Sequence, residues 1–256
     1  MKIIVSVKQV PARDSILRVN GEGNWLDDVD LNYEINEPDA YALEEALQLK
    51  EKHGGEVVAV CAGPDRSVQT LREALAKGAD RGIHVKLEDA KVLDPAVTGR
   101  LLAKAIETES AELILTGLQS DDLGYGQTGV VLAEILGFPH ATIVMEAEIK
   151  NDSIRVKREL ENGWFQYLEL PLPSVLTIQS GIKKLRYATL MGIKKAKSKE
   201  VKVIEAGSLG LAPQPSVHME RVYLPEKKKQ SQLFTGDPKQ AAAHLVEKLR
   251  FEARIL

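Results

Sequence analysis

Short apolar runs rich in β-branched residues alternate with helix-forming segments through the first 140 residues of the chain. Gly and Pro bound many of these runs, and the segments between them repeat apolar residues at helical spacing. Strands that alternate with helices at intervals of about 25–30 residues predict a parallel sheet with right-handed crossovers and helices on both faces. We therefore expect an α/β protein with strands over residues 2–10, 56–62, 78–85 and 111–116, and helices over 36–52, 65–77 and 94–107.

The pattern changes after residue 140, where strand-type segments follow one another without helices between them. Residues 142–150, 153–157 and 164–170 predict successive antiparallel strands joined by short polar turns. A further apolar strand is predicted over Ser174–Ile178, after two prolines. We expect the hairpins to extend one edge of the parallel sheet.

Regular periodicity ends after Val203. Residues 206–235 contain scattered Gly and Pro, and so long an irregular stretch is unusual inside a compact domain. A last helix is predicted from Asp237, with an apolar stripe that needs a surface to bury against. We therefore expect residues 1–203 to form a doubly wound, mostly parallel α/β domain and residues 204–256 to form an extended C-terminal arm on another subunit.

A glycine-rich junction, GLQSDDLGYGQTG over Gly117–Gly129, follows the strand at 111–116 and precedes an apolar helical segment. Its four glycines allow positive φ angles and let a ligand approach main-chain N–H groups. The helix that follows is expected to begin near Gly126–Thr128, and its free N–H groups and positive dipole end favour an anion such as phosphate. An ordinary solvated turn with a helix cap fits the local pattern equally well.

Three further segments are expected at the same edge of the sheet as this junction. Ser6–Lys8 and Ala62–Pro64 follow strands, and a helix start lies at Asn36–Asp39. Because ligands of parallel sheets bind at the carboxyl ends of the strands, the four segments together predict one binding pocket.

The composition and the motifs exclude several functional classes. Cys61 is the single cysteine, so the chain has no intrachain disulfide and no cysteine-built metal site, and we expect Cys61 to be a small core residue. The five histidines are scattered without metal-ligand spacing, and no nucleophile–base pair or P-loop lysine motif is present. The N-terminus lacks the pattern of a signal peptide, and no apolar run is long enough for a membrane helix. We expect a cytoplasmic protein that binds a nucleotide without catalytic machinery, metal or membrane insertion.

Residues 179–200 form a basic segment interleaved with apolar side chains. This pattern suits a docking surface for an acidic, partly hydrophobic partner, and a solvated basic surface helix explains it as well. Nucleic-acid binding has little support, because the net charge of the chain is −3 and no stacking aromatics or known reading motif accompany the segment.

Several motifs, spread over nearly the full chain, together resemble one known family, the β subunits of electron transfer flavoproteins. They are VSVKQV at Val5–Val10, NEPDAYALEEALQLKEK at Asn36–Lys52, AGPDRSVQTLREALAKGADRGIHV at Ala62–Val85, GLQSDD at Gly117–Asp122 with QTG at Gln127–Gly129, VKRELENG at Val156–Gly163, LPSVLTI at Leu172–Ile178, and LRYATLMGIKKAK at Leu185–Lys197.

The resemblance implies an adenine nucleotide α-hydrolase-like fold and a heterodimer of α and β subunits. In this family the β subunit binds AMP, and the α subunit holds most of one FAD. Electrons pass from acyl-CoA or other dehydrogenases to a quinone oxidoreductase or another acceptor. By residue match the AMP site comprises Ser6, Asn36, Glu37, Pro38, Asp39, Ala62, Gly63, Gly117, Ser120, Asp122, Leu123, Gly124, Tyr125, Gly126, Gln127 and Thr128.

The same resemblance assigns partner recognition to the basic segment 179–200. Leu190 is implied to be the apolar anchor that inserts into a dehydrogenase, and residues 204–256 are implied to wrap the α subunit. The implied partner-binding residues are Arg186, Tyr187, Leu190, Met191, Ile193, Lys194 and Lys195.

Two departures from the family pattern leave alternatives open. The junction has Gly124-Tyr125-Gly126 where AMP-binding members usually have Cys-Asn after an acidic cluster, and Met191 replaces the usual proline after the anchoring leucine. A bifurcating subgroup binds a second FAD in place of AMP, but Thr128 and Val130 do not match its loop. A stand-alone adenine-nucleotide-binding module of the same superfold is a further alternative.

Overall fold

The computed structural model describes residues 1–88, 93–211, 214–225 and 231–256. Within them the chain divides into two units, Met1–Arg221 and Val222–Leu256. The first unit contains β1 (Lys2–Ser6), β2 (Gln9–Pro11), β3 (Tyr33–Ile35), α1 (Glu37–His53), β4 (Glu56–Gly63), α2 (Val68–Lys77), β5 (Arg81–Lys86), α3 (Pro95–Ile106), β6 (Leu113–Gly117), α4 (Thr128–Leu136), β7 (His140–Lys150), β8 (Ser153–Glu159), β9 (Phe165–Pro171), β10 (Ser174–Ile178), α5 (Leu190–Ala196) and β11 (Val201–Glu205). The second unit contains α6 (Pro238–Phe251).

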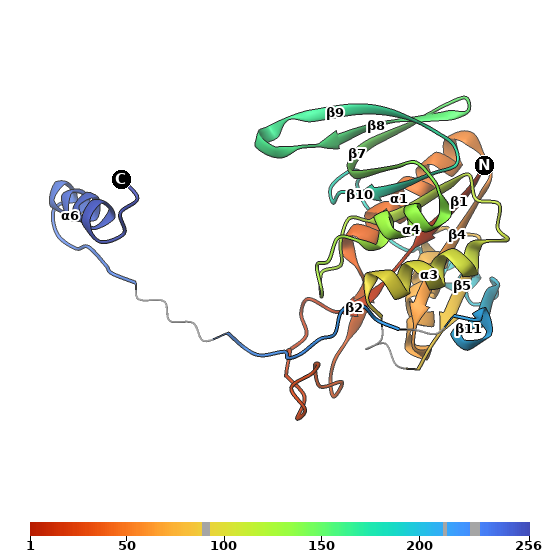
Figure 1. Ribbon diagram of the computed structural model, residues 1–256, viewed down its shortest axis with the longest axis horizontal. Coiled ribbons are helices and arrows are strands. Elements are labelled where there is room, and N and C mark those ends of the chain that lie inside the picture. The colour runs from red at the N-terminus through yellow and green to blue at the C-terminus, as the bar shows by residue number, and fades with distance from the viewer. Residues whose placement is uncertain (89–92, 212–213, 226–230) are drawn as a thin grey trace. The chain divides into compact units, whose positions relative to one another are not determined.

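A large sheet organises the first unit, with the strand order β11-β5-β4-β1-β6-β10-β7-β8-β9 (Figure 1). The strands from β11 to β7 pair in parallel, and β7, β8 and β9 form the antiparallel edge. The α/β class, the mostly parallel sheet and the hairpins at one edge are confirmed.

Helices cover both faces of the sheet because the apolar side chains of its central strands alternate between the two faces. Ile3 and Val5 pack with the apolar faces of α1 and α2, whereas Ile4 packs with α3 and α4. Successive strand residues point to opposite faces, so buried runs such as those of β1 and β4 supply both cores. The doubly wound arrangement is therefore confirmed.

The first strand is shorter than predicted. β1 ends at Ser6, and after Val7 and Lys8 the chain leaves the large sheet to form β2, which pairs with β3. Val7 donates its N–H to the carbonyl of Val60, at 2.9 Å, but Lys8 donates its N–H to the side chain of Asp39 instead. The expected continuous strand over residues 2–10 is wrong because this acceptor turns the chain at Lys8.

Strand β11 lies just where the sequence pattern was expected to become irregular. It pairs in parallel with β5 at the edge of the sheet, and Val201 and Ile204 pack against opposite cores. The sequence pattern did not predict β11, because the strand is short and lies between charged residues. Alternation over five residues is a weak signal beside a basic segment.

Candidate functional site

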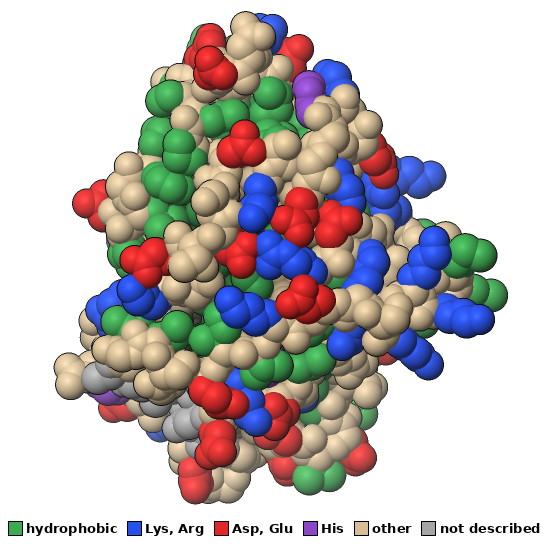
Figure 2. All heavy atoms as spheres, turned by 90° about the vertical axis from the view of Figure 1, so that its right-hand side faces the viewer, with side chains coloured by type: hydrophobic (Ala, Val, Ile, Leu, Met, Phe, Trp, Pro, Cys, Tyr) green, Lys and Arg blue, Asp and Glu red, His purple; other side chains and the backbone are tan. Residues whose placement is uncertain are grey.

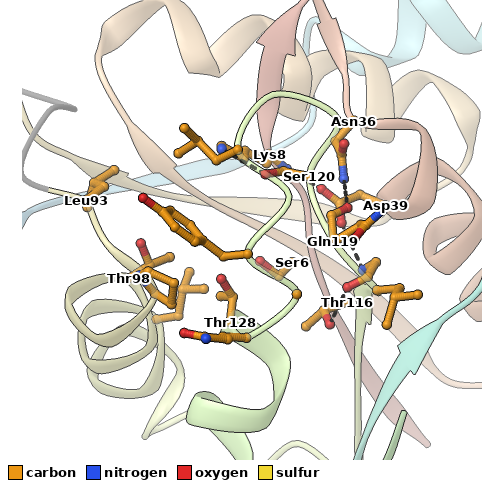
Figure 3. Close-up of a pocket in the computed structure, with 18 of the residues that line it drawn as sticks. Ser6, Lys8, Asn36, Asp39, Leu93, Thr98, Thr116, Gln119, Ser120 and Thr128 are labelled. Atoms are coloured by element: carbon orange, nitrogen blue, oxygen red, sulfur yellow. Dashed lines mark hydrogen bonds between the residues drawn. The ribbon is translucent and has the colours of Figure 1, made fainter. Parts of the chain in front are cut away.

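A cavity lies at the carboxyl ends of β1, β4 and β6, at the edge where the sequence predicts a pocket (Figure 3). The loop after β6 and the N-terminal turns of α3 and α4 complete its lining. Most of the predicted nucleotide-site residues are brought together there. They are Ser6, Asn36, Asp39, Ala62, Gly117, Ser120, Leu123, Tyr125, Gly126, Gln127 and Thr128.

The remaining predicted site residues do not line the cavity: Glu37, Pro38, Gly63, Asp122 and Gly124. Two of these residues, Gly63 and Gly124, make main-chain contacts in the segments that adjoin the cavity. Gly63 is buried, and its carbonyl lies 2.9 Å from Nε2 of the buried His84. Gly124 donates its N–H to the carbonyl of Ser120 at 2.9 Å, which closes the turn of the loop.

The carboxylate of Asp39 joins two strand ends to the start of α1. Its Oδ2 accepts the N–H of Lys8 and its Oδ1 accepts the N–H of Gly117, both at 2.8 Å. Gly117 must be glycine, because a Cβ there would lie 2.4 Å from Oδ1 of Asp39. Burial raises the pKa of Asp39 to about 7, against the opposing effect of the two N–H donors.

Asn36 holds the loop after β6 with both ends of its side-chain amide. Its Nδ2 donates to the carbonyl of Gln119 (Figure 3), and its Oδ1 accepts the N–H of Asp121, each at 2.9 Å. Asn36 is almost fully buried, so these bonds replace its contacts with water. The start of α1 therefore fixes the loop that forms one wall of the cavity.

Lys8 brings a positive charge to the same loop. Its Nζ donates to Oγ of Ser120 at 3.2 Å (Figure 3) and to Oδ1 of Asp122 at 2.6 Å. Asp122, which does not line the cavity, thus acts by positioning the ammonium group of Lys8, which does.

The N-terminal end of α4 lies in the cavity wall without a side-chain cap. The N-cap residue Gln127 makes no capping hydrogen bond, and both Gln127 and Thr128 line the cavity. Gly126 just before them has a φ of +64°, a conformation that glycine adopts without strain. Gly129 lets the helix approach the sheet, because a Cβ there would lie 2.5 Å from Oγ1 of Thr116. The wall therefore presents the free N–H end of a helix, which suits an anion.

The start of α3 also lines the cavity, and sequence reasoning missed it. Leu93, Asp94, Pro95 and Thr98 face the cavity, with Leu102 behind them. The Asp-Pro pair was interpreted only as a helix start, although a helix start between two strands of a parallel sheet commonly lies at the ligand edge. That topological signal was the one that could have found these residues.

Asp94 ties this helix start to the segment that follows β11. Its Oδ1 accepts the N–H of Val97 at 2.6 Å, and its Oδ2 accepts the N–H of Ser216 at 2.5 Å and of Val217 at 3.2 Å. Burial opposes ionisation, but these backbone donors outweigh it and hold the pKa of Asp94 below its usual range. The carboxylate therefore stays charged and fixes residues 216 and 217 beside the cavity.

The predicted partner-binding segment is an exposed piece of chain followed by the short helix α5. Tyr187, Leu190 and Met191 are 91%, 88% and 67% exposed, and Ile193, Lys194 and Lys195 are exposed as well. Large apolar side chains gathered on a surface commonly mark an interaction site.

Arg186 lies apart from this set, because its guanidinium group is paired with glutamates of α1.

Cys61 lies in the core as expected, and burial raises the pKa of its thiol to about 12. Among the described residues no group of three or more His, Cys, Asp or Glu side chains is placed to hold a metal ion. No helix in the described ranges is both long enough and apolar enough to cross a membrane.

Comparison with known proteins identifies the family. Residues 24–209 match the family described as the electron transfer flavoprotein domain. The electron transfer flavoprotein subunit beta of Methylophilus methylotrophus is 38% identical, over 96% of this chain and 97% of that protein. The human and Bacillus subtilis proteins of that description are 38% and 36% identical, over 82% and 87% of this chain and 84% and 88% of their own.

The chain therefore belongs to the electron transfer flavoprotein family, as the sequence motifs predicted, and specifically to its β subunits. Members of this family are flavin-associated electron carriers rather than enzymes in the usual sense.

We predict that Asp39→Asn lowers the stability of the protein, because the nitrogen of an amide cannot accept an N–H group, whereas both oxygens of the Asp39 side chain can accept one whether it is protonated or ionised. Leaving a buried donor unpaired costs about 1–3 kcal/mol. Folding raises the pKa of Asp39, so folding favours the protonated side chain. The resulting contribution of Asp39 to the free energy of unfolding is fully present below about pH 4 and is lost as the pH rises to about 7. Urea unfolding at pH 4–8 should show the difference between wild type and variant narrowing as the pH rises.

Asp14→Asn is the matched control, because Asp14 is exposed. Its unfolding midpoint should follow that of the wild type at every pH. A difference between wild type and Asp39→Asn that stays constant or widens with pH would contradict the assignment of the raised pKa.

Proposed function

We propose that this chain is the β subunit of a heterodimeric electron transfer flavoprotein. The observation that carries the proposal is membership of the β-subunit family over almost the whole chain. In the heterodimer an α subunit holds most of the FAD, which carries the electrons, and the β subunit shares the interface around it. Acyl-CoA or other dehydrogenases are the electron donors, and a quinone oxidoreductase or a similar protein is the acceptor.

The cavity at the carboxyl edge of the sheet is proposed to hold AMP as a structural ligand. Three features support a nucleotide monophosphate there: the uncapped start of α4, the ammonium group of Lys8, and the hydroxyl groups of Ser6, Thr98 and Thr128 (Figure 3). The phosphate would meet the main-chain N–H groups at Gly126–Thr128. Tyr125 and Leu93 provide apolar surface for the base.

The segment 179–200 is proposed to dock the electron-transfer partners, with Leu190 as its anchor. On the face drawn in Figure 2, Lys and Arg side chains gather toward one flank beside hydrophobic ones. In segment 179–200 itself, Leu190 and Met191 are exposed together with Lys194 and Lys195. Exposed apolar side chains beside positive charges suit a partner with an acidic, partly apolar surface.

The predicted arm, residues 204–256, is proposed to bind the α subunit; its residues 204–221 belong to the first unit, and Val222–Leu256 form the second. In the second unit, α6 carries exposed apolar side chains, including Leu245, Val246 and Phe251. Among the described residues of α6 none is buried, so within that unit the helix has no core of its own. A helix with an apolar stripe of this kind commonly needs a partner surface.

Substituting Gly126 by leucine should release AMP from the purified heterodimer without changing its flavin. The leucine side chain would project from a residue that lines the cavity, whereas Gly124 has the same φ of +64° but does not line it. Gly124→Leu therefore carries the same backbone strain and should keep its AMP. Chromatography of the released nucleotides measures both; equal AMP content in the two variants would contradict the assigned site.

Leu190→Ala should slow reduction of the flavin by an acyl-CoA dehydrogenase about tenfold or more, because it removes a large apolar side chain that is 88% exposed. Its FAD content and its reduction by dithionite should stay unchanged, since Leu190 contributes no buried surface to the fold. Stopped-flow absorbance measures both reactions. Val203→Ala, which truncates a half-exposed residue of β11, is the control and should leave the rate unaltered. A wild-type rate in Leu190→Ala would remove the anchor assignment.

A further inference from the structure

The exposed apolar surface around Leu190 has little core of its own to hold it in place. Within α5, Ala196 is the one buried residue that the described structure shows. Residues 179–189 form no helix or strand. Tyr187, Leu190 and Met191 all face solvent, so they contribute almost nothing to folding. At the start of the segment Ile182 and Leu185 pack, partly buried, against the core, and the exposed surface beyond them depends on polar contacts at the two ends of the segment.

The first end is fixed by Arg186, whose guanidinium group binds α1. Its Nε donates to Oε2 of Glu44 at 2.8 Å and its Nη2 donates to Oε1 at 3.0 Å, which forms a two-point fork. Its Nη1 donates to Oε1 of Glu51 at 2.6 Å. The main-chain N–H of Arg186 also reaches Oε2 of Glu44, at 3.3 Å.

Glu44 is suited to hold Arg186 because it is buried and shaped by its neighbours. Its side chain is 4% exposed, and Gln48 donates to its Oε1 at 2.7 Å. Burial alone would raise the pKa of Glu44, but the bonds from Arg186 and Gln48 hold that pKa below its usual range. Leaving a buried carboxylate without its partner strongly destabilises the folded protein, so the Arg186–Glu44 pair resists opening.

The second end is fixed by bonds between α2 and the end of α5. Nη1 of Arg72 donates to the carbonyls of Ala196 and Lys199, at 2.7 and 2.6 Å. Nζ of Lys199 donates back to the carbonyls of Leu75 and Ala79, at 3.0 and 2.5 Å. These contacts are independent of Arg186 and anchor the segment where it returns to the sheet.

We propose that Arg186 is a positioning residue that holds the docking segment in its binding conformation rather than a residue that contacts the partner. This proposal rests on the proposed docking role of segment 179–200. Arg186 directly precedes Tyr187 and lies four residues before Leu190, so the Arg186–Glu44 pair sets where these side chains leave the body of the protein. A segment that is already ordered loses less conformational entropy on docking, and this strengthens binding without any new contact.

The prediction concerns hydrogen exchange in the purified heterodimer. Arg186→Gln should speed exchange of the hydrogen-bonded main-chain amides at positions 186, 192 and 193 about tenfold or more, because the first end of the segment is released. Exchange at residues 196–199, held by Arg72, should stay slow. Lys184→Gln is the matched control: it removes a positive charge two residues away, from an exposed side chain, and should leave exchange unchanged.

Glu44→Gln separates positioning from direct contact. Glu44 is 4% exposed and cannot touch a docked protein, yet its substitution should reproduce both the faster exchange and the weaker docking of Arg186→Gln. Glu51→Gln should have a smaller effect, because Glu51 is 59% exposed and its ion pair is screened by water. Arg186→Lys, which keeps the charge but loses the fork, should fall between wild type and Arg186→Gln.

Docking is measured as flavin reduction by an acyl-CoA dehydrogenase over a range of dehydrogenase concentrations. The KM for the dehydrogenase should rise at least fivefold in Arg186→Gln and Glu44→Gln, with kcat within twofold of wild type, because disorder reduces the fraction of protein that is ready to bind. FAD content and dithionite reduction, which need no docking, should match wild type and show that both variants are folded.

The proposal would be overturned if Arg186→Gln raised the KM without faster exchange and Glu44→Gln behaved as wild type. Arg186 would then be a direct contact with the partner. Unchanged exchange and unchanged KM in both variants would overturn it as well. A wild-type protein that accepts no electrons from the dehydrogenase would count against the proposed function, whereas the exchange measurement would still decide whether Arg186 orders the segment.

Discussion

The buried carboxylate of Asp39 is the contact on which the cavity depends. It accepts N–H groups from the end of β1 and the end of β6, which are neighbours in the sheet, and it projects from the first turn of α1. The chain thereby leaves the large sheet at Lys8, just after β1. The loop after β6 runs along the start of α1, where Asn36 holds it. One side chain thus converts two parallel strand ends and a helix start into a preformed wall.

The same principle, a buried acidic group of α1 that accepts bonds from a distant segment, recurs at the other candidate site. Glu44 holds the segment that precedes α5 through Arg186, as Asp39 and Asn36 hold the loop that precedes α4. α1 is therefore the common support of the cavity and of the exposed surface around Leu190. Because α1 packs firmly on the sheet, both sites can be kept in order although neither belongs to the core.

Sequence reasoning found what depends on local pattern and missed what depends on distant partners. The strand–helix alternation gave the fold, and the rule that strand ends share an edge brought Ser6, Ala62 and Gly117 together. The break at Lys8 was not predictable in this way, because its acceptor Asp39 lies 31 residues further along the chain. The pairing of Arg186 with Glu44, 142 residues away, was hidden for the same reason.

The central claim is that the cavity walled by Asp39, Asn36 and the start of α4 holds AMP, while the electron-carrying flavin lies elsewhere in the heterodimer. Quantifying the nucleotides released from the purified heterodimer by mass spectrometry tests it most directly. We expect one AMP and one FAD for each heterodimer. Two FAD and no AMP would contradict it and would place a second flavin in this cavity.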